Sequence, residues 1–229
     1  MNLLQIRQHV MKKSGRHDLA TTRNVGDTTH IWDVDNGADF YIQSGSRALD
    51  LAQDIPEQFF DVGFAIGDYI ADLRDCRQVS RVTVIDSDGV ERTLNAKSSF
   101  SNLVDAYTIL AATGVGPPED WAIYPRVRPP KQKFLGAKDD IHSVILMPPT
   151  DETLTIRVYG QYFSSLLEEN EDENYWSIKF PELLIMAAIR EIEVYNRNTQ
   201  GYNDMTLVIN ERLMGVNRDL EKDELEMEG

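Results

Sequence analysis

The segment Asn174–Asn198, NYWSIKFPELLIMAAIREIEVYNRN, decides the architecture that we expect for this chain. Pro181 has no amide hydrogen, so it suits the first turn of a helix and disfavours helical geometry at Phe180. A short turn therefore precedes a predicted helix over 181–198. Between Leu183 and Ile189 this helix is apolar on every side, so other elements must enclose it.

The same segment supplies the predicted core of a helical bundle, because a helix that is apolar all round is stable when neighbouring helices cover it. The predicted core residues are Trp176, Phe180, Pro181, Leu183, Leu184, Ala187, Ala188 and Ile192. Other parts of the chain must provide the covering helices.

The amino-terminal residues predict one such helix. Leu3, Ile6 and Val10 recur at helical spacing, and Ser14 and Gly15 follow as a stop signal. This spacing indicates a short amphipathic helix with one apolar face.

A second helix is predicted over 38–53, with Asp35 or Asn36 as its cap. Small residues such as Gly45 on its apolar face would let another helix approach closely, although glycine lowers intrinsic helicity. A strand through 40–43 is the competing interpretation, and we favour the helix.

Between 56 and 163 the pattern changes to short segments rich in β-branched and aromatic residues, separated by turn-forming residues. These segments predict an antiparallel sheet domain. The clearest hairpin lies over 81–94, where Asp88 and Gly89 suit a tight turn with positive φ.

Two further elements are predicted in this region. A second hairpin is expected over 142–160, where Pro148 and Pro149 end the first strand. The segment 98–110 favours a short helix that begins with a serine cap at 98 or 99.

The last part of the chain is again helical in pattern. An apolar stripe at spacings of three and four residues needs a partner, and it consists of Tyr202, Met205, Ile209, Leu213, Val216 and Leu220. The end, 221–229, is acidic and is expected to be solvated or to depend on a partner.

These patterns together predict an α+β fold. Helices from both ends of the chain form a bundle, and a small antiparallel β domain is inserted between them. The expected divisions are 1–55, 56–165 and 166–229.

Composition narrows the functional classes. The chain has 229 residues and a formal net charge of -15, which argues against a protein that grips nucleic acid through clustered cations. Passage close to DNA without tight binding remains compatible with this charge. No stretch is apolar and long enough to span a membrane.

Signals for catalysis or metal binding are weak. The single cysteine, Cys76, has no histidine in a partner motif, and the four histidines at 9, 17, 30 and 142 do not follow a metal-binding spacing. We therefore expect neither a metal, nor another cofactor, nor an enzymatic activity.

A basic, proline-rich stretch stands out in this acidic chain. Its cations are Arg126, Arg128, Lys131 and Lys133. It is either a solvated loop or a contact surface for a negatively charged partner.

The order of several segments resembles the head-to-tail adaptor, or connector, proteins of tailed bacteriophages. The similarity of pattern covers most of the chain, although 21–31 and the basic stretch match no common pattern of that family. The segments are MNLLQIRQHVMKKSGRHDL (1–19), ADFYIQSGSRALD (38–50), PPEDWAIYP (117–125), ILMPPTDETLTIRVYGQYF (145–163) and ENYWSIKFPELLIMAAIREIEVYNRN (173–198).

The resemblance implies a structural virion protein, made in the bacterial host and placed at the neck of the particle. It implies a dodecameric ring under the portal protein, joined below to a tail tube or nozzle protein, with genomic DNA passing through without sequence-specific binding. The carboxyl-terminal residues from 218 to 228 are expected to become ordered on docking. Partner-binding residues there are Arg218, Leu220, Leu225 and Met227.

Two other functional classes stay open at this point. A ligand-binding or glycan-binding β domain would use exposed aromatic residues such as Trp121 and Tyr124. A virion hydrolase would use a pair of carboxylates as acid and base.

Overall fold

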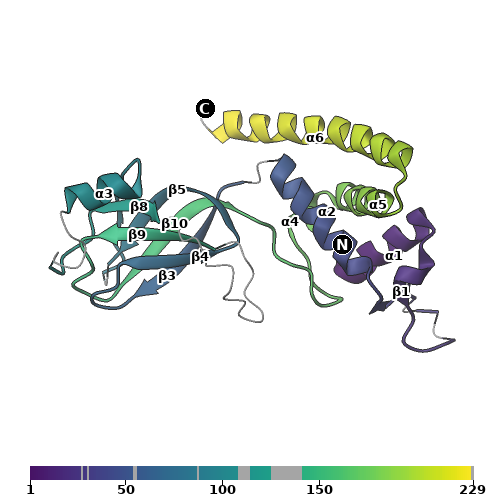
Figure 1. The fold of residues 1–229 in the computed structure, drawn as a ribbon, viewed down its shortest axis with the longest axis horizontal. Coiled ribbons are helices and arrows are strands. Elements are labelled where there is room, and N and C mark those ends of the chain that lie inside the picture. Colours follow the sequence, from purple (N-terminus) through teal and green to yellow (C-terminus); the bar gives the residue numbers. More distant parts are fainter. Residues whose placement is uncertain are drawn as a thin grey trace. The chain divides into compact units, whose positions relative to one another are not determined.

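The chain folds into two compact units. The computed structural model describes residues 1–229 except 27, 30, 54–55, 87, 108–113, 125–140 and 228–229, and gives the backbone alone at 74, 141–142 and 217–227. The helical unit combines Met1–Asp54 with Ser164–Gly229, and the sheet unit is Ile55–Phe163 (Figure 1). The predicted α+β fold is confirmed, because helices from both ends of the chain pack together and antiparallel sheets are inserted between them in sequence.

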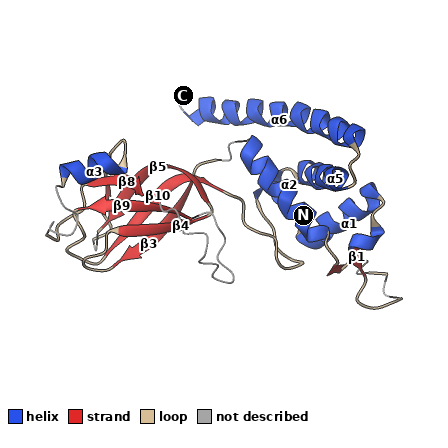
Figure 2. Ribbon diagram, in the orientation of Figure 1, coloured by secondary structure: helices blue, strands red, loops and turns tan. Residues whose placement is uncertain are grey.

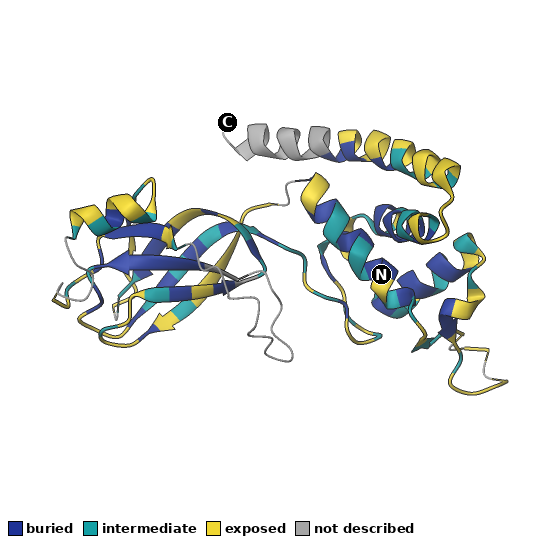
Figure 3. Cartoon of the chain, in the orientation of Figure 1, coloured by how far each residue is buried: buried dark blue, intermediate teal, exposed yellow. Residues whose placement is uncertain are grey.

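In the helical unit, α5 contacts α1, α2, α4 and α6 (Figures 1 and 2). It is the helix whose first half is apolar all round, and that half is mostly buried (Figure 3). The elements of this unit are α1 (Leu3–Ser14), η1 (His17–Leu19), β1 (Ala20–Thr21), β2 (Val34–Asp35), α2 (Ala38–Ala52), α4 (Tyr175–Lys179), α5 (Pro181–Tyr195) and α6 (Thr199–Met227).

Local sequence signals set the helix ends. The Asn2 side chain accepts a hydrogen bond from the Gln5 amide at 3.0 Å, and the Gln5 side chain accepts one from the Asn2 amide at 3.2 Å, which caps α1. Gly15 ends α1 in the left-handed region, with φ of 70°. Pro181 occupies the first turn of α5, as predicted.

The segment that could also have been a strand is the helix α2. Its N-cap residue is Gly37, which differs from the two predicted caps, but the Asp35 carboxylate accepts hydrogen bonds from the amides of Gly37 and Asp39 at 3.1 and 2.9 Å. Asp35 therefore satisfies the amides at the start of α2 from just outside the helix.

Helices α2 and α5 meet backbone to backbone at Gly45. A Cβ atom added to Gly45 would lie 2.7 Å from the backbone nitrogen of Ala188 and 2.9 Å from the carbonyl carbon of Ala187. Real Cβ atoms do not approach so closely, so this contact requires glycine. The small residues predicted on this face of α2 do allow a close approach.

The sheet unit contains two four-stranded sheets. Their strand orders are β3-β10-β5-β6 and β4-β9-β8-β7. Among the strands that the structure describes, the short β7–β8 pair alone is parallel. The strands are β3 (Gln58–Phe64), β4 (Ile70–Arg74), β5 (Cys76–Ile85), β6 (Glu91–Thr93), β7 (Asn95–Ala96), β8 (Asp120–Tyr124), β9 (Ile141–Met147) and β10 (Leu154–Tyr162).

The two sheets share one apolar core and thus form a sandwich. Val82 and Val158 from one sheet cluster with Leu73 and Leu146 from the other, and all four side chains are fully buried. Helix α3 (Phe100–Ala106), capped by Ser99 as predicted, covers the outer face of the second sheet with Leu103. Alternate residues of β10 are buried, as this arrangement requires.

One predicted hairpin is confirmed and one is wrong. Strands β5 and β6 pair as expected over 81–94, with Gly89 at a φ of 80° in the turn. Strands β9 and β10 do not pair with each other: they belong to different sheets. The connection between them instead bonds to the turn before β4, through Gly67 N to Thr150 O at 2.7 Å and Thr150 N to Asp68 O at 3.1 Å.

None of the helices in the described part of the chain combines the length and the apolar character of a membrane span.

Candidate partner-binding surfaces

A groove lies between the start of α5 and the middle of α6, inside the helical unit. Phe180 leaves helical geometry there, with φ of −136° and ψ of 56°, because the following proline disfavours a helical residue before it. The groove has a volume of about 370 Å³. Its lining residues are Lys179, Phe180, Pro181, Glu182, Leu183, Arg212, Gly215 and Val216.

The carboxylate in this groove already has a partner. Glu182 lies 2.6 Å from the Lys13 ammonium of α1. That hydrogen bond lowers the pKa of Glu182, and the positive charges of Lys13, Arg212 and His9 act in the same direction. Glu182 is therefore charged near neutral pH, and Lys13 neutralises it.

Two cations of the groove, unlike Glu182, have no close partner of opposite charge among the described side chains. Lys179 and Arg212 are exposed. Neither makes a hydrogen bond or an ion pair with another residue in the described part of the chain. Beside them lie the apolar side chains of Phe180, Leu183 and Val216. The groove thus offers positive charge next to an apolar floor.

An acidic loop, residues 168–173, lies between the sheet unit and α4 in sequence. Asp172 holds its shape, because its carboxylate accepts hydrogen bonds from the amides of Glu168 and Glu169, both at 2.9 Å. These bonds lower the pKa of Asp172. The exposed carboxylates of the loop belong to Glu168, Glu169, Glu171 and Glu173.

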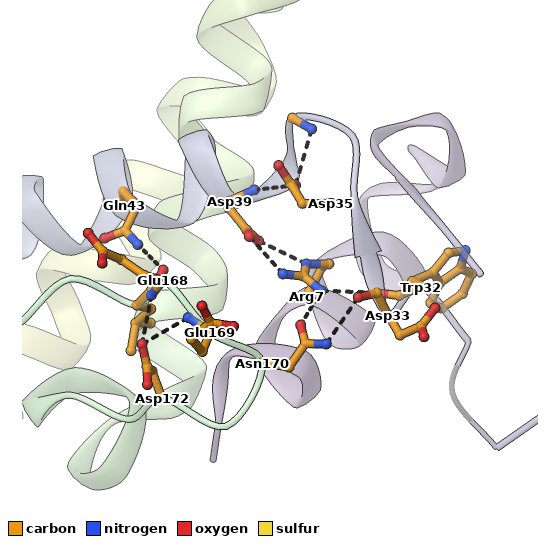
Figure 4. A network of polar contacts seen from close by, with 12 residues as sticks. Arg7, Trp32, Asp33, Asp35, Asp39, Gln43, Glu168, Glu169, Asn170 and Asp172 are labelled. Carbon is orange, nitrogen blue, oxygen red and sulfur yellow. Dashed lines mark hydrogen bonds and ion pairs between the residues drawn. The ribbon is translucent and has the colours of Figure 1, made fainter. Parts of the chain in front are cut away.

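A buried arginine anchors the acidic loop to the helices (Figure 4). The Arg7 guanidinium donates two hydrogen bonds to the Asp39 carboxylate at 2.8 and 2.7 Å and one to the Asn170 side chain at 2.8 Å. Asn170 in turn donates to the backbone oxygen of Asp33 at 3.0 Å. One buried side chain of α1 therefore joins α2, the loop before it and the acidic loop.

A second buried carboxylate explains why α5 is preceded by a tryptophan. Asp50 of α2 is 1% exposed and accepts hydrogen bonds from the Trp176 indole at 2.6 Å and from the Ser164 amide and hydroxyl at 2.9 and 2.7 Å. Trp176 fills the core with its ring and satisfies its N–H on this carboxylate. The interaction fixes the point at which the chain returns to the helical unit.

The outer face of the β3-β10-β5-β6 sheet carries exposed aromatic and charged side chains. The Arg157 guanidinium lies 4.4 Å from the ring centre of Phe59, and Arg81 lies 4.0 Å from that of Tyr159. Each ring therefore already has a cation over one of its faces. This leaves less of the ring surface for stacking a ligand.

The aromatic residues proposed for a ligand-binding β domain lie elsewhere. Trp121 is 6% exposed and belongs to the sandwich core, so its expected role as an exposed contact residue is wrong. Tyr124 is half-buried and packs edge-on against Phe100 at a ring distance of 4.9 Å. Both residues stabilise the sheet unit.

The apolar stripe on the last helix has a partner within the chain. Ile209, Leu213 and Val216 are buried, and α6 packs against α5. The predicted need of this stripe for a partner is therefore met inside the chain for these three residues. On other positions of α6, Leu207 and Met214 are largely exposed.

The predicted bundle core is mostly enclosed. Trp176, Leu183, Leu184, Ala187, Ala188 and Ile192 are buried. Phe180 and Pro181 are only partly buried, because they line the groove.

The other predicted contact residues lie either outside the described residues or on the part of α6 for which the structure gives the backbone alone. Arg126, Arg128, Lys131 and Lys133 lie outside the described residues. Arg218, Leu220, Leu225 and Met227 lie on α6, whose backbone is helical as far as Met227 in the single chain. The expectation that 218–228 becomes ordered on docking stays a prediction.

Two observations concern the reactive groups of the described residues. Burial raises the pKa of the Cys76 thiol to about 11, so the thiolate is scarce near neutral pH. No group of three or more potential metal ligands occurs among the residues that the structure describes.

Sequence reasoning missed the groove and the acidic loop as surfaces. The run of acidic residues at 168–173 was a visible signal for the loop. The groove has no such signal, because its two cations are separated by more than thirty positions and meet through the packing of α6 on α5.

The sequence matches no model of a known protein family, and no curated protein is significantly similar to it.

Proposed function

We propose that this chain is a head-to-tail adaptor of a tailed bacteriophage. In this role, copies form a ring beneath the portal protein, join it to a tail tube or nozzle protein and surround the path of the genomic DNA. The order of the sequence segments, which resembles that of the adaptor family, first supports this function.

The observation that carries the proposal is the enclosure of α5 by helices from both ends of the chain. The resemblance implies this arrangement, with a β domain inserted in sequence between the two halves of the bundle. The apolar residues of α5 are buried against α1, α2 and α6. This packed bundle supports the proposal, because the resemblance implies the same order of terminal helices and inserted β domain.

Surface properties are compatible with a channel component. The net charge of -15 would make a ring that repels DNA and allows it to slide. Helix α6 has 29 residues, which corresponds to a length of roughly 40 Å. Exposed apolar residues such as Leu207 and Met214 give it contact area beyond its packing on α5.

Co-sedimentation with the portal ring of the same phage tests the proposal. We expect saturable binding, with electron microscopy showing an added ring at one end of the portal. A chain truncated after Val216 should lose this binding because it lacks 217–229. Absence of binding by the full chain, across a range of salt and protein concentrations, would contradict the proposal.

A matched control separates docking from folding. Asn210→Ser changes an exposed polar residue of α6 outside the proposed contact and should leave portal docking intact. The circular dichroism of the truncated chain should show that its remaining helices persist. Portal docking that survives truncation would remove 217–229 from the contact surface.

A further inference from the structure

We infer that neighbouring copies of this chain join through the groove of one copy and the acidic loop of the next. The groove is the one lined by Lys179 and Arg212, and the acidic loop is residues 168–173. This inference rests on the proposed ring and names the lateral contact within it.

Charge makes such a contact selective. Two copies with a net charge of -15 each repel one another over most of their surfaces. A lateral contact therefore needs a place where positive charge is not already neutralised. Neither Lys179 nor Arg212 has an ion-pair partner within 4 Å among the described side chains, whereas Lys13 is paired with Glu182. Arg212 also helps to lower the pKa of Glu182, so Lys179 is the cation of the groove with less compensation inside the chain.

The groove strengthens the attraction that these cations exert. Phe180, Leu183 and Val216 give it an apolar floor. A carboxylate that enters it exchanges water for an environment of lower dielectric constant, where opposite charges attract more strongly. The methylene groups of a glutamate side chain can cover the apolar floor while its carboxylate reaches a cation.

The acidic loop has the shape and rigidity to fill this role. Asp172 fixes its turn, and the backbone of α1 holds it through Leu3 N to Asp172 O at 2.9 Å and Leu4 N to Asn170 O at 3.0 Å. A preformed loop loses little conformational entropy on binding. Its exposed glutamates therefore extend from a preformed turn, and among them Glu173 is already paired with the amino-terminal ammonium at 3.5 Å.

The two surfaces lie on different sides of the helical unit. Figure 1 draws the loop that leads to α4 on the side of α2 away from α6. The groove is lined in part by Arg212, Gly215 and Val216 of α6. Complementary patches at separate places on one subunit generate head-to-tail contacts, which close into a ring when the rotation between neighbours closes.

Zero-length cross-linking tests the contact directly. A carbodiimide couples a lysine amine to a carboxylate with which it is in contact, so it should join Lys179 to a glutamate of 168–173. Mixing isotope-labelled and unlabelled full-length chains shows by mass spectrometry whether the link is between copies. We expect a mixed-isotope link whose yield falls as salt is raised. Absence of this link in concentrated wild-type protein, alone and on portal rings, would overturn the inference.

Charge reversal gives a second and more specific readout. The groove variant Lys179→Glu/Arg212→Glu and the loop variant Glu169→Lys/Glu171→Lys should each reduce association of copies by at least about tenfold, measured by sedimentation of chains alone and by copies bound per portal ring. Mixing the two variants should restore association, because each reversed surface then faces its complement. Failure of the mixture to recover would contradict the contact.

The matched control is Lys12→Glu/Arg197→Glu, which changes the net charge equally at exposed cations outside the groove. It should leave the contact between copies intact. Failure of the wild-type chain to bind portal rings would count against the adaptor role. The cross-link between copies in solution would still test the lateral contact by itself. Full rings formed by the groove variant would overturn the lateral contact and leave the adaptor role standing.

Discussion

The two units of the molecule each contain an arginine that holds an aspartate with two hydrogen bonds, but in very different surroundings. In the helical unit, Arg7 donates to Asp39 at 2.8 and 2.7 Å, and the two side chains are 3% and 20% exposed. In the sheet unit, Arg157 donates to Asp61 at 2.7 and 2.8 Å, and the side chains are 24% and 40% exposed. The hydrogen-bond distances of the two pairs are nearly the same, but the side chains differ in their exposure to solvent.

The pKa values of the two aspartates move in opposite directions. Burial raises the pKa of Asp39, and the attraction of Arg7 only partly offsets that effect. The hydrogen bonds from Arg157 lower the pKa of Asp61, since little desolvation opposes them. Burial therefore decides which of two opposing effects is larger.

This contrast separates two ways of stabilising a fold. The helical unit uses buried polar groups to fix where loops join helices, as Arg7 and Asp50 do. The sheet unit relies on an apolar core shared by two sheets. The Arg157–Asp61 pair lies at its surface, and the buried Asp120 is paired with Lys97 at 3.1 Å. We expect substitutions at matched positions to have unequal effects.

The largest effect is expected for Asp39→Ala. The substitution leaves the Arg7 guanidinium buried without its carboxylate, which should cost about 3–5 kcal/mol in the free energy of unfolding of the helical unit. Urea denaturation gives the loss, and hydrogen exchange should place it in α1 and α2.

Asp61→Ala is the control for this comparison. It removes the same contacts from an exposed pair, so the cost should be about 0–1 kcal/mol in the sheet unit. Equal losses for the two variants would show that burial does not distinguish the pairs.

An intermediate effect is expected for Gly45→Ala. The added methyl group would meet the backbone of Ala188, so α2 and α5 must separate. Overpacking of this kind costs about 1–3 kcal/mol. Denaturant titration of the purified variant measures the change.

The matched control is Gly215→Ala on α6, where no atom beyond the local backbone of α6 lies within 4 Å of the added Cβ. Alanine has a higher helix propensity than glycine, so this variant should be more stable by about 0.5–1 kcal/mol. A stabilising Gly45→Ala would contradict the close approach of α2 and α5.

The smallest effects are the shifts in titration. Carboxyl carbon chemical shifts followed by NMR should give Asp39 a midpoint above the ordinary value of about 3.9 and Asp61 a midpoint below it. The raised pKa of Asp39 contributes stability that is present below the unfolded-state pKa and is lost as pH rises through the folded-state pKa. The lowered pKa of Asp61 contributes stability present above the unfolded-state pKa, and this is lost as pH falls through the folded-state pKa. Midpoints in the reverse order would refute the assignment of burial as the cause.

Several features could be predicted because they depend on neighbouring residues. The spacing of Leu3, Ile6 and Val10 predicted α1, and Pro181 predicted the start of α5. Gly89 predicted the β5–β6 turn. In each case the chemistry lies within a few positions, so local periodicity and backbone preferences are sufficient.

The partners of strands and surfaces could not be predicted in this way. The pattern of β9 and β10 suits a hairpin, yet they lie in different sheets because Thr150 bonds to the turn before β4. Trp121 is a residue type that often contacts ligands, but here it is enclosed by the sandwich. Pairing and burial depend on residues far apart in sequence, which periodicity does not encode.

Sequence alone was thus enough for the helices at both ends, the inserted β domain and the acidic character of the chain, since these follow from local pattern and composition. Three-dimensional packing was needed for the buried Arg7 and Asp50 networks and for the groove of Lys179 and Arg212. The physical reason is that a charge acts according to its distance from other charges and its exposure to water, and both are set by the fold.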